Sequence, residues 1–213
     1  MMTQQTRMIC RTALCFAVFV LGLSCAHAQS RLTPKSLVIY GGKGILADYY
    51  TEIESLLLQS SYRFAYIVRP SFRPEYSLIG TKDNTLILRK AEQQIWSYDM
   101  PKKVSIKEYQ LQVSPAVIDS ISNLFESAVV TSSYLAEVLG NDGTTYDFIS
   151  GYYTAGCWSP DDDSNCGKLV ALAGSICKAV ELHDSIMIEN NLGNITKLHH
   201  TFKTLYNEKP SEE

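Results

Sequence analysis

The spacing of hydrophobic positions changes from a helical to a strand period near residue 60. Apolar residues recur every three to four positions over 46–59, which predicts a helix. The next three segments are rich in β-branched and aromatic residues and are separated by prolines or by Lys82-Asp83-Asn84. They predict an antiparallel meander with strands at 62–68, 75–80 and 85–95. The last segment carries helix-favouring residues near its end, and the alternative for that end is a short helical segment that finishes at Trp96.

A further strand and a second helix follow the meander. Residues 104–113 alternate in the manner of a strand. Ser114 is suited to an N-cap, and Pro115 to the first helical turn, where its missing N–H costs nothing. One face of the expected helix is apolar, with Val117, Ile118, Ile121, Leu124, Phe125 and Ala128.

A β-hairpin is predicted after Asp142-Gly143. The segments 144–149 and 152–158 are β-branched or aromatic, and Ser150-Gly151 between them is a turn dipeptide. Pro160 should end the second strand, because it donates no backbone hydrogen bond.

Helices should complete the chain. The acidic run 161–163 and Ser164 offer N-caps for a helix from about Asn165 to Met187. Residues 190–193 then interrupt the pattern, and 195–206 form a last amphipathic helix.

Together these elements predict an α+β fold, with an antiparallel sheet of about five or six strands and three or four helices packed on one face. The short apolar run 37–40 is a further strand candidate, followed by a glycine turn at 41–44. We expect one domain over 29–213 with frayed ends, of which 29–34 is a mobile terminus.

Residues 1–28 have the pattern of an export signal. Arg7 and Arg11 give a positively charged n-region, and residues 12–24 form an almost unbroken apolar run. Ala26-His27-Ala28 then matches a small-x-small cleavage site. We therefore expect a mature chain from Gln29 that is periplasmic or secreted.

The apolar run of this signal is shorter than the roughly 20 residues of a permanent span, so we expect no transmembrane anchor after cleavage. The alternative is a lipoprotein anchored through Cys25. Both alternatives predict an exported protein.

Charge argues against nucleic acid as a partner. The chain has a formal net charge of −3, and cleavage of the signal would remove two positive charges and no acidic ones. No cluster of lysines and arginines alternates with aromatic residues, as a phosphate-binding stripe requires.

Three cysteines follow the expected cleavage site. Cys166 and Cys177 on one helix would lie about 16 Å apart, too far for a disulfide. Cys157 with Cys166 is the feasible disulfide in an oxidising compartment, and Cys177 reads as a small buried residue.

The sequence matches cofactor-binding and metal-binding motifs only in part. Gly42-x-Gly44-x-x-Ala47 fits a dinucleotide fingerprint, but no βαβ pattern or ribose-binding acid follows it. Asp161, Asp163 and Asn165 are spaced like the start of a calcium loop that then lacks its glycine and its final glutamate. We expect no metal and no cofactor, and we nominate no catalytic residue.

Two functional hypotheses remain. The preferred one is a non-enzymatic module that binds an envelope protein or a glycan through the aromatic residues of the hairpin, Tyr146, Tyr152, Tyr153 and Trp158. Strands use the same residue types for core packing, which is the structural alternative. The enzymatic alternative is a small hydrolase or thiol enzyme that uses Cys177 or Cys157 with a histidine, His199 or His200.

Three motifs carry a resemblance to known proteins. Leu88-Arg89-Lys90-Ala91-Glu92 with Ile95-Trp96, Asp142-Gly143-Thr144-Thr145-Tyr146-x-Phe148, and Trp158-Ser159-Pro160 with Gly167-Lys168-Leu169-Val170 occur in that order. Over about 63–186 the chain resembles a group of uncharacterised exported proteins of Gram-negative gut bacteria. The resemblance implies an envelope location and one small domain, and it implies no activity. Cys157 and Cys166 are particular to this chain.

Overall fold

The computed structural model describes residues 30–35, 45–58, 61–96, 103–134 and 142–208. The expected signal peptide, the strand candidate at 37–40 and the glycine turn at 41–44 lie outside these residues.

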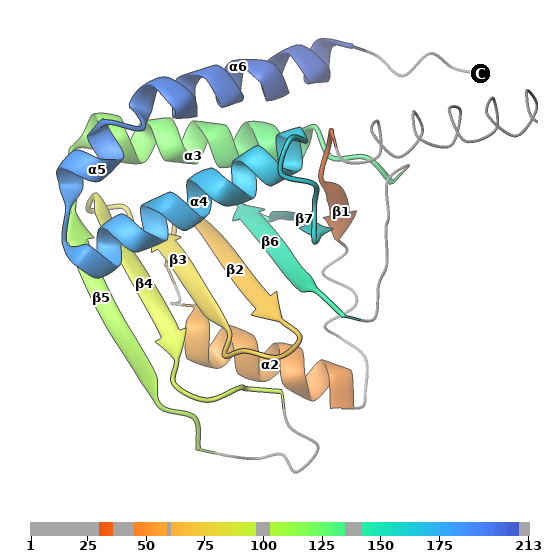
Figure 1. Ribbon diagram of the computed structural model, residues 1–213, viewed down its shortest axis with the longest axis vertical. Helices are drawn as coiled ribbons and strands as arrows, with labels where there is room; N and C mark the ends of the chain where they lie inside the picture. The colour runs from red at the N-terminus through yellow and green to blue at the C-terminus, as the bar shows by residue number, and fades with distance from the viewer. Residues whose placement is uncertain (1–29, 36–44, 59–60, 97–102, 135–141, 209–213) are drawn as a thin grey trace, which may run out of the picture.

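An antiparallel sheet forms the middle of the molecule (Figure 1). The described residues form seven strands, instead of the five or six expected, and the predicted α+β class is confirmed. The meander and the hairpin are both present, and the hairpin joins the sheet beside the first strand of the meander. The spatial order is β1 (Thr33–Lys35), β7 (Tyr153–Trp158), β6 (Thr144–Ser150), β2 (Phe64–Pro70), β3 (Tyr76–Gly80), β4 (Thr85–Ala91) and β5 (Ile106–Gln112).

The segment after the expected cleavage site includes strand β1, so the expectation of a mobile terminus over 29–34 is wrong for Leu32, Thr33 and Pro34. β1 pairs with β7, with Thr33 opposite Gly156. Leu32 is fully buried, and its carbonyl accepts a hydrogen bond from the Ser133 amide at 2.8 Å. Three paired residues are too few to show a strand period in the sequence, so only the pairing reveals this element.

Four helices lie on one side of the sheet: α3 (Pro115–Val130), α4 (Asn165–Leu182), α5 (Ser185–Glu189) and α6 (Leu192–Asn207). α3 and α4 pack on the sheet, and α6 packs on α3 (Figure 1). The core beneath them contains an aromatic cluster in which Phe125 meets Phe148 and Phe64 edge-on, with both ring-centroid distances at 5.1 Å. The predicted cap of α3 is confirmed, because Ser114 accepts a hydrogen bond from the Val117 amide.

α2 (Ile45–Leu57) covers the opposite face of the sheet, whereas the sequence analysis placed the helices on one face. Tyr49 and Ile53 of α2 belong to a second apolar cluster with Ala65 and Ile67 of β2. All of 64–68 is buried, because alternate residues of β2 face different helices. A continuous apolar run of this kind indicates burial on both faces.

Two predicted helical segments are different in the structure. The helix expected to reach Met187 ends at Leu182, because His183 adopts left-handed backbone angles (φ 54°) and Asp184 caps α5 by accepting from the Met187 amide. The helical turn considered for the end of β4 is absent. Instead, the fully buried Glu75 accepts hydrogen bonds from the amides of Ile95 and Trp96 at 2.7 and 3.2 Å.

Candidate functional site

Two tyrosines lie on the α4 side of the sheet, one on each side of Val68. Tyr76 of β3 and Tyr146 of β6 are both register partners of Val68 of β2. Directly paired residues point to the same face, and neighbouring strands are about 4.8 Å apart. The backbones of the two tyrosines are therefore about 10 Å apart, with an apolar side chain between them.

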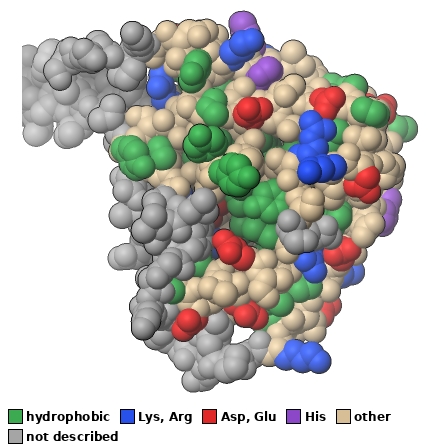
Figure 2. Space-filling view, turned by 180° about the vertical axis from the view of Figure 1, so that it is seen from behind, with side chains coloured by type: hydrophobic (Ala, Val, Ile, Leu, Met, Phe, Trp, Pro, Cys, Tyr) green, Lys and Arg blue, Asp and Glu red, His purple; other side chains and the backbone are tan. Residues whose placement is uncertain are grey.

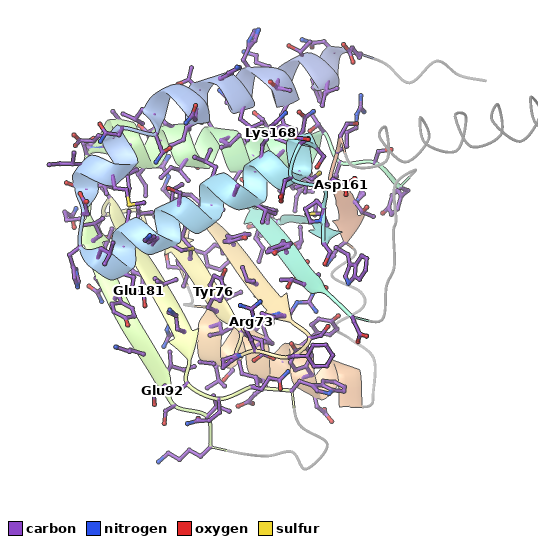
Figure 3. The ribbon with its side chains drawn as sticks, viewed as in Figure 1. Arg73, Tyr76, Glu92, Asp161, Lys168 and Glu181 are labelled. Atoms are coloured by element: carbon purple, nitrogen blue, oxygen red, sulfur yellow. The ribbon has the colours of Figure 1, made fainter. Side chains whose placement is uncertain are left out.

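These residues line a depression that we call the tyrosine groove. Its volume is about 310 Å³, and its lining includes Val68, Arg73, Tyr76, Lys90, Thr144 and Tyr146. Figure 3 shows Tyr76 and Arg73 on the part of the sheet that α4 leaves uncovered. Its location on a rigid sheet, beside a helix that stops short of it, makes the groove a suitable binding surface.

A buried tyrosine supports one ring of the groove on the same face of the sheet. Tyr146 is parallel to the fully buried Tyr66, with ring centroids 6.2 Å apart and an interplanar angle of 2°. Burial, with the nearby Cys177 and Tyr146, raises the pKa of Tyr76, although Arg73 acts in the opposite direction. Both Tyr66 and Tyr76 therefore remain neutral hydrogen-bonding groups at physiological pH.

Two cations border the groove. Lys90 is engaged with Glu181 of α4, with Nζ and Oε1 2.8 Å apart, and this hydrogen bond lowers the pKa of Glu181. Arg73 is exposed, and no carboxylate pairs with it among the described residues. Arg73 is thus the charge that a ligand can reach.

The four hairpin residues predicted to bind do not form one surface. Tyr146 lies in the tyrosine groove, whereas Trp158, the partner of Thr145, lies on the α2 side of the sheet. Tyr152 and Tyr153 lie at the hairpin turn, where Tyr152 is 90% exposed. Because successive strand residues point to opposite faces, a run of aromatic residues along one strand is divided between two sides. Sequence reasoning missed Tyr76, whose only local signal is its place in a predicted strand.

The cysteines are free thiols in the structure, which corrects the expected disulfide between Cys157 and Cys166. These two thiols are hydrogen-bonded neighbours between β7 and α4. That hydrogen bond, with burial, raises the pKa of Cys157 far above its usual range.

The thiol-enzyme hypothesis finds little support in this arrangement. Burial raises the pKa of Cys177 to about 12. No hydrogen bond joins a histidine to a cysteine within the described residues. A nucleophilic cysteine needs a lowered pKa or an adjacent base, and neither is found there.

A buried ionic network lies on the opposite face of the sheet. Asp147 of β6 is bound by Arg69, whose Nε and Nη2 donate to Oδ2 at 2.9 and 2.5 Å, and by Lys35 of β1 through Oδ1. Burial alone would raise the pKa of Asp147, but Arg69 and Lys35 together lower it. The single acid within the β-branched and aromatic strand 144–150 was the sequence signal for this site, and the sequence analysis did not use it.

Of the N-caps predicted for α4, Ser164 is the one that caps the helix in the structure. Ser164 accepts a hydrogen bond from the Gly167 amide at 2.9 Å. Where the structure describes the chain, no group of three or more His, Cys, Asp or Glu residues could hold a metal ion.

No protein-family model matches the chain, and a search of the curated proteins finds no match. Over the described ranges, no helix is both long and apolar enough to cross a membrane.

Proposed function

We propose that this chain is an exported, non-enzymatic module that binds a glycan through the tyrosine groove. The observation that carries the proposal is the placement of Tyr76 and Tyr146 on either side of Val68. Export is supported by the signal pattern of residues 1–28.

The chemistry of the groove supports a sugar ligand. Pyranose rings have an apolar face that packs on aromatic rings, while their hydroxyl groups need polar partners around them. Tyr76 and Tyr146 supply rings with polar tips, and Thr144 adds a hydroxyl group to the lining. Arg73 adds donors that suit a carboxylate-bearing sugar.

The experiment is co-sedimentation of the mature chain from Gln29 with peptidoglycan sacculi, followed by calorimetric titration with the soluble sugar chitotriose. Tyr76→Ala and Tyr146→Ala should each weaken binding about three- to tenfold, the effect of one lost aromatic contact. Tyr153→Ala removes an exposed ring outside the groove and should bind as the wild type does.

Thermal melting separates binding from folding, because a variant that melts like the wild type has kept its core. If neither sacculi nor chitotriose binds, the glycan proposal fails. If the chain instead captures an envelope protein, and Tyr146→Ala no longer binds that protein, the groove is a protein-binding site and the glycan proposal is wrong.

A further inference from the structure

A second depression lies between α2 and strands β2, β6 and β7, on the face opposite the tyrosine groove. We call it the α2 pocket. Its volume of about 140 Å³ is well below the 300–1,000 Å³ typical of pockets for drug-sized ligands, so it suits a very small molecule. Figure 2 shows this side of the molecule, where hydrophobic side chains gather at the centre with acidic and basic side chains around them.

The buried end of the α2 pocket contains a cation whose carboxylate partner is shared with a second cation. Arg69 and Asp147 both line it, with side chains only 11% and 2% exposed. Asp147 also binds Lys35, which does not line the pocket and whose side chain is 25% exposed, so Asp147 neutralises Arg69 only in part. A partly neutralised cation at a buried position is costly, and a bound anionic group would offset this cost.

Arg69 has donors left for such a group. A guanidinium carries five N–H bonds. Within the described residues, three of them are used, two by Asp147 and one by the Tyr50 hydroxyl at 3.1 Å. The guanidinium also lies over the Tyr50 ring, with Cζ of Arg69 4.9 Å from the ring centroid. This contact fixes the orientation of the guanidinium. A carboxylate is the anion whose geometry best matches the remaining N–H groups.

The exposed end of the pocket is acidic and aromatic. Glu54 of α2 is exposed and lines the pocket together with Tyr62 and Tyr152. Burial and the nearby carboxylate of Glu54 raise the pKa of Tyr62, which places the two side chains close together. A carboxylate beside aromatic rings attracts an ammonium group through both its charge and the ring faces.

We infer that the α2 pocket binds a small zwitterion of the α-amino acid class, with its carboxylate on Arg69 and its ammonium group beside Glu54 and the tyrosine rings. A simple anion would meet Glu54, and a simple cation would meet Arg69, so only a molecule with both charges is complementary to both ends. The inference uses neither the tyrosine groove nor its ligand.

The test is a nuclear magnetic resonance titration of the ¹⁵N-labelled mature chain at constant ionic strength. The probes are glycine and L-alanine, with acetate and methylammonium as single-charge controls. The amino acids should shift the Arg69 Nε–H resonance and the amides of 151–154 in a saturable way, at concentrations at least tenfold below those needed for either control. The zwitterion assignment is overturned if acetate acts as well as alanine, or if no probe gives a saturable shift.

Two variants of α2 locate the ammonium end without disturbing the buried network. Glu54→Gln removes an exposed charge of the lining, and it should weaken alanine binding about tenfold while acetate binding stays the same or improves. Glu52→Gln makes the same charge change on the same helix outside the lining, and should bind as the wild type. Unchanged alanine binding in Glu54→Gln would remove the ammonium site and with it the inference.

Discussion

Asp147 accepts two hydrogen bonds from Arg69 on a single oxygen, at 2.9 and 2.5 Å, and its other oxygen binds Lys35. The three residues come from β6, β2 and β1; β6 and β2 are neighbours in the sheet, whereas β7 lies between β6 and β1. One carboxylate thus links the segment after the expected cleavage site to the centre of the fold.

This network should make stability depend on pH. Because the folded pKa of Asp147 is below the roughly 3.9 of an unfolded chain, its contribution is complete above that value and is lost as pH falls through the folded pKa. Asp147→Asn should cost about 3 kcal/mol at pH 7, since it leaves two cations unpaired in a buried place. Urea unfolding from pH 2 to pH 7 should show the difference between the two proteins shrinking in acid.

Asp119→Asn is the control for that measurement. Its ion pair with Arg63 has a 2.7 Å separation but is solvent-exposed, so its loss should cost less than about 1 kcal/mol. A difference between wild type and Asp147→Asn that stays constant over the whole pH range would contradict the role given to the ionised carboxylate.

Gly156 makes room for the same network. A Cβ at this position would be 2.5 Å from the Tyr146 carbonyl oxygen and 2.7 Å from Asp147 Oδ1. Gly156→Ala should therefore destabilise the fold by about 1–3 kcal/mol. Gly174→Ala is the matched change inside α4, where a Cβ meets nothing within 4 Å, and it should stabilise by about 0.5–1 kcal/mol. Urea midpoints that move in the same direction for both variants would show the packing argument to be wrong.

Glu75 should be more important for stability than any acid on the surface. It is fully buried and accepts from the Tyr49 hydroxyl at 2.9 Å as well as from the amides of Ile95 and Trp96. Glu75→Ala should lower the free energy of unfolding by about 2–4 kcal/mol, because it leaves these buried donors without an acceptor. Tyr49→Phe should lower it by about 1 kcal/mol. Glu92→Ala, on the exposed segment nearby, is the control and should be close to neutral. Equal losses for Glu75→Ala and Glu92→Ala in urea unfolding would refute this assignment.

The thiols should be unreactive while the protein is folded. With a pKa of about 12, Cys177 has roughly one thiolate in ten thousand molecules at pH 8. Iodoacetamide should therefore label the folded mature chain far more slowly than the same chain in urea, where Cys157, Cys166 and Cys177 all react. Fast labelling of the folded protein at neutral pH, read by mass spectrometry, would restore the thiol-enzyme hypothesis.

Local patterns were reliable where neighbouring residues decide the outcome. The cap at Ser114, the hairpin turn at Gly151 and the apolar face of α3 are all contained within a few positions of the sequence. Predictions failed where distant groups compete with local propensity. Residues 91–96 favour a helix, yet Glu75, about 20 positions earlier, takes two of their amides.

The sequence by itself determined the α+β class, the meander, the hairpin and the capped helices, because each depends on the period of side chains and on capping groups close by. Only the tertiary structure decided which side of the sheet each helix covers, that β1 joins β7, and that Tyr76 and Tyr146 flank Val68 while Trp158 faces the other way. These relationships depend on strand order and register, which follow from pairing between segments far apart in the chain, and no local period encodes them.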